Sequence, residues 1–237
     1  FVEKCAMSAT ESSPLLWPWL ASPEVVEYGA NMCATFFMLS PCAQMIQLFR
    51  RRGATLNSIN PLTMILLFTN CSLWLSWGYF LPMPPAIPAN LLGLIAGSAY
   101  LAICWGYATV GKANAPAWGQ RTALQTSGMV MMSLVLARYA ATSTMAAEHV
   151  GYLAMIISVC LFASPLSELA RVLEERCSER LPPLQCAMQF LSTFLWLVVG
   201  LRKSSVQIIV CNGLGFALAA VQVGLIATLP SVPARKK

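Results

Sequence analysis

Two tryptophans and two asparagines recur at matching positions in the two halves of the chain. The same offset of 122 residues relates four pairs: Trp74 and Trp196, Gly78 and Gly200, Asn90 and Asn212, and Gly93 and Gly215. An asparagine amide both donates and accepts hydrogen bonds, and a tryptophan ring offers a broad apolar face with one polar N–H group. These groups suit a neutral solute with hydroxyl groups and apolar C–H faces, such as a sugar. We predict that one unit is duplicated and that both copies face a shared path.

Each of these residue types also has a simpler explanation. An asparagine inside a membrane can hold two helices together, with a gain of about 0.6 kcal/mol, and tryptophan is common at the membrane interface. For a single asparagine the simpler explanation is favoured. The duplication of the whole set favours a binding pocket.

The composition is that of an integral membrane protein. Of the 237 residues, 57% are apolar and 10% are charged, whereas a soluble domain carries about 25% charged residues. The net charge of +6 comes from basic residues scattered between apolar stretches, which argues against nucleic-acid binding. The nine cysteines form no CxxC pair and His149 is the only histidine, so we expect no metal site and no cofactor.

Seven stretches meet the requirement of about 20 mostly apolar residues for a spanning helix: residues 26–48, 61–81, 86–109, 122–144, 150–171, 183–201 and 206–229. Eleven Lys and Arg residues fall in the loops on one side of these helices and four on the other. Because basic residues favour the cytoplasmic side, we expect the N-terminus outside and the C-terminus in the cytoplasm.

An odd number of helices constrains how two copies can be arranged. The second three-helix copy keeps the orientation of the first only if one extra helix separates them, so we predict an all-α protein with a three-plus-one-plus-three arrangement. The predicted segments are an N-terminal tail (1–25), the first repeat (26–110), a linker helix (111–146), the second repeat (147–230) and a basic tail (231–237). The path would then lie between two parallel repeats.

Several runs of this sequence resemble the SWEET (MtN3/saliva) family of sugar transporters. In the second half these are ASPLSELARVLEERCSERLPPLQCAMQFLSTFLWLVVG and CNGLGFALAAVQVGLIATLP, and in the first half SPCAQMIQLFRRR, LLFTNCSLWLSWG and NLLGLIAGSAY. The resemblance covers about residues 28–230 and implies bidirectional, facilitated transport of a mono- or disaccharide.

The resemblance also implies a set of substrate-binding residues. In the family, one asparagine from the third helix of each repeat binds sugar hydroxyls, and these positions are Asn90 and Asn212 here. Positions on the second helix of each repeat complete the pocket; they are Asn70 and Trp74, and Ser192 and Trp196. Phe37 and Leu161, one helical turn before the first-helix prolines, occupy positions that tune the size of the pocket.

A gate of four prolines is expected on the cytoplasmic side, and Pro41, Pro165 and Pro182 match three of them. The fourth is expected seven residues before Asn70, where this chain has Thr63, and Pro61 lies two residues earlier. Two residues rotate a helical position by about 200°. Pro61 is therefore a candidate for the fourth gate proline that would lie on a different side of the helix.

At the outer gate an aromatic residue precedes the glycine of each repeat in the family. Trp77 precedes Gly78 in the first copy, but Val199 precedes Gly200 in the second. We therefore assign Trp77 and the two glycines to the gate and hinge.

The predicted function is uniport of a sugar by alternating access. Apart from Glu27, Glu168 and Arg171 near helix ends, the six predicted repeat helices contain no Asp, Glu, Lys, Arg or His, which argues against coupling to protons. Phe37, Leu161 and the two tryptophans favour a hexose such as glucose over a disaccharide. The expected partners are the sugar and the lipid bilayer of the plasma membrane, and relatives form homo-oligomers.

Three other functions compete with this prediction. A related PQ-loop transporter of amino acids or other small solutes would share the architecture, but it typically has a Pro-Gln pair where this chain has Pro41-Cys42. A seven-helix receptor, or a purely structural membrane protein, gives no reason for the duplicated spacing. Nothing in the sequence indicates an enzyme, and no catalytic residues are predicted.

Overall fold

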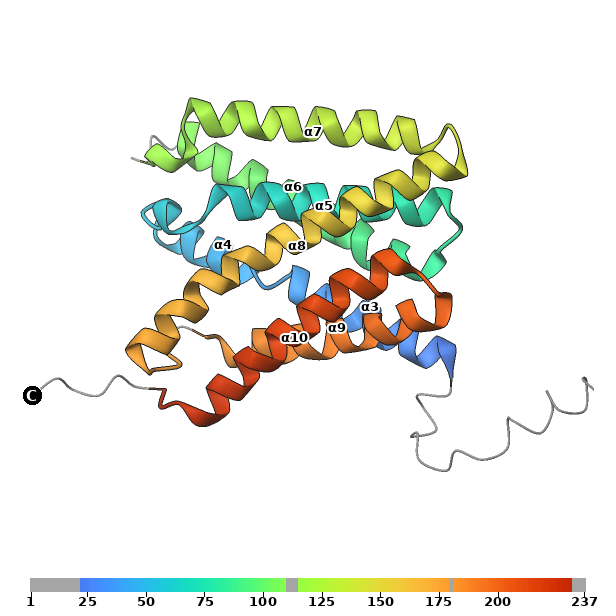
Figure 1. Cartoon of the computed structure of the whole chain (residues 1–237). Helices are drawn as coiled ribbons and strands as arrows, with labels where there is room; N and C mark the ends of the chain where they lie inside the picture. Colours follow the sequence, from blue (N-terminus) through green and yellow to red (C-terminus); the bar gives the residue numbers. More distant parts are fainter. Residues whose placement is uncertain (1–21, 110–114, 180, 232–237) are drawn as a thin grey trace, which may run out of the picture.

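The computed structural model describes residues 22–109, 115–179 and 181–231, apart from the side chains of residues 162–168. Its helices follow in the order α3 (Pro23–Met38), α4 (Cys42–Arg50), α5 (Pro61–Phe80), α6 (Ile87–Thr109), α7 (Gln120–Ala140), α8 (Thr144–Glu175), α9 (Pro183–Lys203) and α10 (Val206–Thr228). Figure 1 shows α5, α7 and α9 running across the picture, with α8 and α10 tilted relative to them. Both predicted terminal tails lie almost entirely outside the described residues.

Local signals set where most helices begin. Pro61 and Pro183 open α5 and α9, where the missing N–H of proline costs nothing. Ser143 caps α8 by accepting a hydrogen bond from the Ala146 N–H at 3.1 Å. Because of this cap α8 begins at residue 144, six residues before the predicted start at 150, and the helix predicted to reach residue 144 ends at Ala140. The sequence prediction missed this cap.

The first predicted span is broken into two helices. It was predicted as one helix over residues 26–48, but α3 ends at Met38 and α4 begins at Cys42, with a turn over residues 39–41 between them. Pro41 has no N–H to donate into the preceding turn, and it occupies the N-cap position of α4. Proline thus breaks this helix instead of only bending it.

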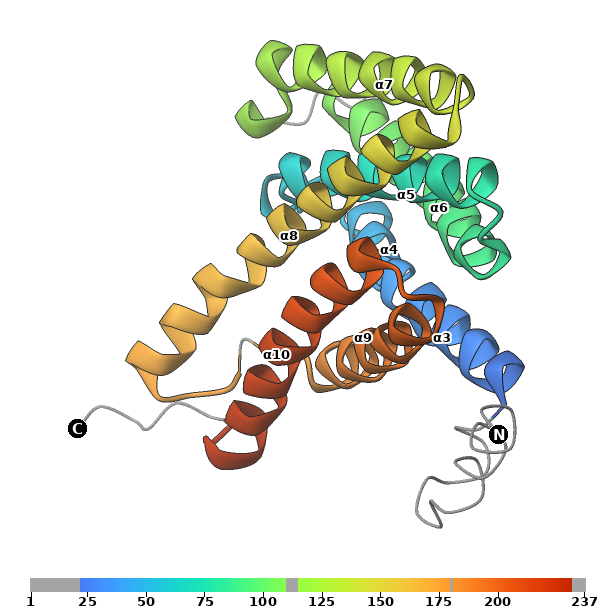
Figure 2. The ribbon, with the colours of Figure 1, turned by 45° about the vertical axis from the view of Figure 1, so that its right-hand side comes forward.

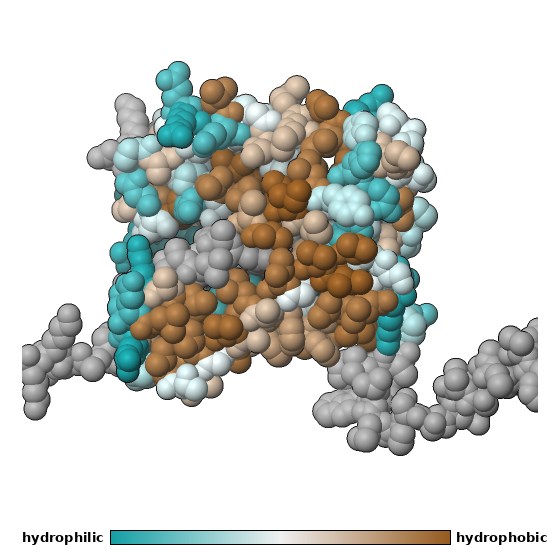
Figure 3. All heavy atoms as spheres, viewed as in Figure 1, coloured by the Kyte–Doolittle hydropathy of each residue, from teal (hydrophilic) through white to brown (hydrophobic). Residues whose placement is uncertain are grey.

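Five helical stretches in the described part of the chain are long and apolar enough to cross a membrane, namely residues 23–50, 84–109, 144–161, 183–203 and 206–228. The predicted spans over 61–81 and 122–144, which became α5 and α7, do not reach that level. Both carry several polar side chains, such as Asn70 and Ser76 in α5 and Gln120 and Arg121 in α7. Figure 3 shows hydrophobic residues across the middle of one face, with hydrophilic residues at both ends of the helices.

The packing repeats itself when the two halves are exchanged. In the first half α5 packs on α6, as α9 packs on α10 in the second. Between the halves α3 packs on α9, as α8 packs on α5. Helix α7 has no counterpart and packs on α5 and α8, and Figure 2 shows it on the far side of the bundle from α9 and α10. The arrangement is the predicted three-plus-one-plus-three.

The two ends of the bundle differ in how the halves are joined. We call the end that carries the connections 81–86, 141–143 and 204–205 the closed end. There a single apolar core joins both repeats through residues such as Val26, Trp77, Val150, Val199 and Ile208.

The opposite end, with the connections 51–60 and 176–182, we call the open end. Here each repeat has a core of its own. One is built around Leu48, Ile59 and Met64, and the other around Val172 and Cys186. The helix break at residues 39–41 lies where α3, in the shared core, gives way to α4, in the core of the first repeat.

Candidate functional site: a cavity between the two repeats

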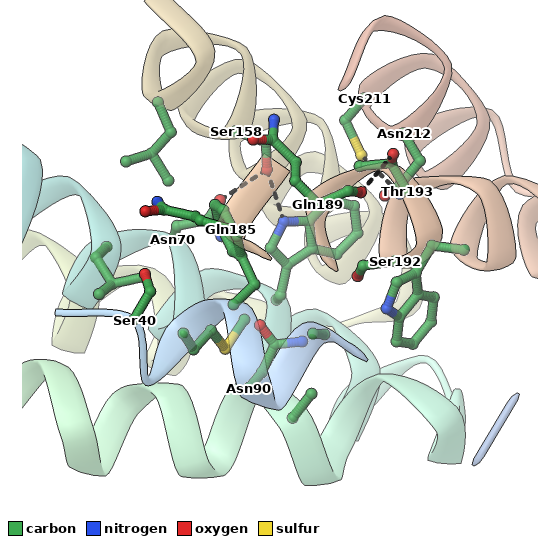
Figure 4. Close-up of a pocket in the computed structure, with 18 of the residues that line it drawn as sticks. Ser40, Asn70, Asn90, Ser158, Gln185, Gln189, Ser192, Thr193, Cys211 and Asn212 are labelled. Atoms are coloured by element: carbon green, nitrogen blue, oxygen red, sulfur yellow. Dashed lines mark hydrogen bonds between the residues drawn. The ribbon is translucent and has the colours of Figure 1, made fainter. Parts of the chain in front are cut away.

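A cavity of about 300 Å³ lies between the two repeats. Its lining comes from α3, α4, α5, α6, α8, α9 and α10, together with Ala86 and residues of the turn before α4. All eight residues predicted to bind substrate line it: Phe37, Asn70, Trp74, Asn90, Leu161, Ser192, Trp196 and Asn212. The fold thus brings the whole predicted set to one place, and several of these residues are labelled in Figure 4.

The two asparagines are held in the same way in both repeats. Asn90 Nδ2 donates to the Ala86 carbonyl at 2.7 Å, and Asn212 Nδ2 donates to the Ile208 carbonyl at 3.0 Å. Each bond reaches back four residues, so neither asparagine uses this amide to join two helices. In each residue Oδ1 has no protein partner among the described residues, so both can offer an acceptor to a bound solute.

A hydrogen-bonded bridge crosses between the repeats at the first tryptophan. Trp74 Nε1 donates to Ser158 Oγ at 2.9 Å, and that hydroxyl lies 2.7 Å from Asn70 Oδ1. Trp74 and Asn70 belong to α5, whereas Ser158 belongs to α8. The bridge fixes the orientation of the indole ring and of the amide that face the cavity.

The second tryptophan lacks such a bridge. The counterpart of Ser158 is Ala34, since each lies seven residues before the proline of a Ser-Pro pair. Alanine offers no hydroxyl, and in the described structure neither Trp196 Nε1 nor Ser192 Oγ has a hydrogen-bond partner. The polar groups of this wall are therefore available to a ligand.

No charged side chain is found among the described residues that line the cavity. Because α8 begins earlier than predicted, Glu148 and His149 do lie inside a repeat helix, contrary to the expectation. Both have hydrogen-bond partners near the closed end. Glu148 accepts a hydrogen bond from Gln207 Nε2, and His149 Nδ1 lies 2.9 Å from the Tyr139 hydroxyl. The cavity suits an uncharged solute.

The proposed gate prolines are placed differently from one another. Pro41 lines the cavity, and so does Thr63, whereas Pro61 and Pro182 are not among its lining residues. Pro165 lies in α8 within the segment whose side chains are outside the described part of the structure.

The predicted gate residues of the closed end belong to the shared core. Trp77 is 2% exposed and packs edge-on against Trp74, with ring centroids 5.2 Å apart. A Cβ atom on Gly78 would lie 2.9 Å from Ala86 Cβ, and one on Gly200 would lie 2.8 Å from Ile208 Cγ2. Both glycines thus let the second helix of a repeat approach the start of the third.

Sequence reasoning missed several polar residues of the cavity. Besides Ser158, the lining includes Gln185 and Gln189 of α9. A usable signal was present, because residues 185, 189, 192 and 196 follow one another at spacings of four, three and four, which place them on one helix face.

A helical bundle of two parallel three-helix repeats around a central cavity is an architecture found among membrane transporters. A family model described as a sugar efflux transporter for intercellular exchange matches residues 148–234. The bidirectional sugar transporter SWEET1b of Oryza sativa subsp. japonica is 29% identical over 213 residues, covering 84% of this chain and 76% of that protein. The sugar transporter SWEET1 of Drosophila pseudoobscura pseudoobscura is 28% identical over 169 residues, covering 69% of this chain and 71% of that protein.

The fold is also that of a solved eukaryotic SWEET transporter. The two structures align with a TM-score of 0.73 at 22% sequence identity, over 88% of this chain and 97% of the other. The chain is thus similar to SWEET transporters in sequence over most of its length and in fold. These matches agree with the predicted resemblance and confirm the predicted fold class, and the matched relatives are named as transporters.

Proposed function

We propose that this protein transports a monosaccharide such as glucose across a membrane, in either direction and without ion coupling. The observation that carries the proposal is the cavity between the repeats, which gathers two asparagines and two tryptophans from matching positions. The amides can bind sugar hydroxyls, and the indole rings can cover the apolar faces of the sugar ring. The curated relatives described above are named as sugar transporters.

The size of the cavity supports a single sugar ring. Its volume of about 300 Å³ is at the lower end of the roughly 300–1,000 Å³ typical of small-molecule sites. Phe37 and Leu161 take part of the space on two sides. A disaccharide would require these walls to move apart.

The difference between the two ends supports alternating access. One core joins the repeats at the closed end, while at the open end the described side chains form a separate core in each repeat, which would let the repeats move apart there. The exposed side chains of Gln44 and Gln185 lie at the mouth of the cavity. The open end also carries Arg50–Arg52, so by the distribution of basic residues it faces the cytoplasm. In this inward-open state the sugar would enter and leave the cavity from the cytoplasmic side.

The uncharged lining supports transport down a gradient. Proton-coupled carriers use ionisable groups inside the membrane as relays, and the described lining of this cavity has none. A zwitterionic amino acid would also lack charged partners here, which disfavours the PQ-loop alternative.

The test is uptake of radiolabelled glucose, fructose and sucrose into proteoliposomes, for the wild type and for Asn90→Ala and Asn212→Ala. We expect glucose uptake that is equal in both directions and unaffected by a proton ionophore. Each replacement should lower uptake at least tenfold without lowering the melting temperature, because each amide bonds only within its own helix turn.

Asn31→Ala is the matched control for an asparagine that holds the fold together. Its side chain donates to the Pro85 carbonyl at 2.9 Å and accepts from the Ala89 N–H at 3.1 Å. We expect this variant to lower the melting temperature, unlike Asn90→Ala and Asn212→Ala. Undiminished glucose uptake in the Asn90→Ala, Asn212→Ala double variant would refute the proposed site.

A further inference from the structure

Gln189 of α9 carries a buried side-chain amide that the fold leaves unsatisfied. The residue is 5% exposed, and its Nε2 atom has no hydrogen-bond partner. Its main-chain carbonyl accepts from Thr193 Oγ1 at 2.8 Å, but no bond to the side-chain amide is found among the described residues. A buried donor without a partner destabilises the protein unless something else binds it.

The amide borders the cavity and belongs to a row of polar groups along α9. Gln189, Ser192 and Trp196 all line the cavity, and Figure 4 shows Gln189 among the labelled polar side chains around it. The Ser192 hydroxyl and the Trp196 N–H also lack partners in the described structure. Three neighbouring groups on one helix face can therefore hydrogen-bond to a ligand.

The opposite wall is different. The counterpart of Gln189 at the offset of 122 residues is Leu67 of α5, which also lines the cavity but has no polar group. On the same helix Trp74 and Asn70 are bridged by Ser158. On α5 the Trp74 N–H and the Asn70 Oδ1 are thus engaged by Ser158, whereas on α9 the corresponding Trp196 N–H, the Ser192 hydroxyl and the Gln189 Nε2 have no partner in the described structure.

We propose that Gln189 is a substrate-binding residue whose amide hydrogen-bonds to one hydroxyl group of the transported monosaccharide. With Ser192 and Trp196 it forms a row of open polar groups on α9 that binds sugar hydroxyls, while on α5 the Trp74 N–H is already bonded to Ser158. This inference rests on the proposed function, and it assigns a specificity-determining position that the repeat symmetry does not reveal.

The experiment measures binding of glucose and of its 2-, 3-, 4- and 6-deoxy analogues to purified protein by tryptophan fluorescence. Gln189→Leu introduces the residue type found at the matching position of the first repeat, Leu67. Gln189→Met is the second variant, which keeps the length of the side chain and is used if the leucine variant does not fold. We expect both to raise the Kd for glucose about tenfold, equivalent to about 1.4 kcal/mol. One deoxy analogue should bind to wild type and variant equally, because it lacks the hydroxyl that Gln189 binds.

Gln222→Leu is the matched control. Gln222 on α10 is also buried, at 3% exposed, and its Oε1 has no partner, but it is not among the residues that line the cavity. We expect its replacement to change the Kd for glucose less than twofold. Neither glutamine variant should melt at a lower temperature than the wild type, since each removes an unsatisfied polar group.

Two results would overturn the inference while leaving the proposed function intact. One is an unchanged Kd for glucose in Gln189→Leu and Gln189→Met. The other is an equal loss of affinity for glucose and all four analogues together with a lower melting temperature, which would show a structural role. If wild-type protein bound none of these sugars, the proposed function itself would be wrong.

Discussion

The bridge from Ser158 to Trp74 and Asn70 gives a quantitative prediction about how the repeats are held together. Ser158→Ala removes one hydroxyl that is 6% exposed and leaves the Trp74 N–H and the Asn70 Oδ1 without their partner. A hydrogen bond contributes about 0.5–1.5 kcal/mol net, so the loss of two bonds amounts to about 1–3 kcal/mol. For a chain of this size, at about 2–4 °C per kcal/mol, that corresponds to a melting temperature lower by roughly 2–12 °C.

Ser192→Ala is the matched control for this measurement. Ser192 is also buried and lines the same cavity, at 7% exposed, but its hydroxyl has no protein partner within the described structure. We expect its melting temperature to stay within about 1 °C of wild type. The assay is thermal unfolding of detergent-purified protein with a thiol-reactive dye, which reports the exposure of buried cysteines such as Cys71.

A double-mutant cycle tests whether the two residues act through the bond between them. Trp74→Phe alone should also destabilise the protein, and the combination with Ser158→Ala should cost less than the sum of the two single changes. Equal melting temperatures for Ser158→Ala and Ser192→Ala, or strictly additive effects in the cycle, would refute the reasoning.

Three further predictions concern the packing and the charges of the same bundle. Gly200→Ala places a Cβ atom 2.8 Å from the Ile208 side chain, so we expect the free energy of unfolding to fall by about 1–3 kcal/mol. Gly128→Ala is the control, because a Cβ atom there meets nothing within 4 Å, and its better helix propensity should raise the melting temperature. Trp196→Phe should weaken glucose binding without lowering the melting temperature, in contrast to Trp74→Phe, and a loss of stability in both would contradict the assigned asymmetry. Glu27→Gln removes the ion pair with Lys203, 3.2 Å long, at the closed end. Because both side chains are partly exposed, the free energy of unfolding measured by chemical denaturation should fall by less than about 1 kcal/mol. A larger loss would show that this pair holds the closed end.

Much of the candidate site could be predicted from the chain alone. The offset of 122 residues pairs Trp74 with Trp196 and Asn90 with Asn212. The family resemblance added the other four predicted binding residues, and all eight line one cavity. This worked because a duplicated unit folds twice in the same way, and residues three or four apart on a helix share a face. Apolar length agreed for five of the seven predicted spans, while α5 and α7 fall below that level and the first span is broken into α3 and α4.

The asymmetry of the cavity could be decided only by the tertiary structure. Ser158 bridges to Trp74 across two repeats, and the two residues are 84 positions apart. Gln189 is unsatisfied only because no neighbouring helix brings a partner to it. Such facts depend on which side chains meet between helices, and no local pattern encodes that.

The sequence by itself thus determined that the chain is a duplicated membrane bundle with amides and indoles on matching faces. The tertiary structure decided that the first helix breaks at residues 39–41, that one end is joined by a common core while the other is split, and that the α9 wall keeps its polar groups open. The physical reason is that helix periodicity is local, whereas packing and hydrogen-bond satisfaction are settled between segments far apart in the chain.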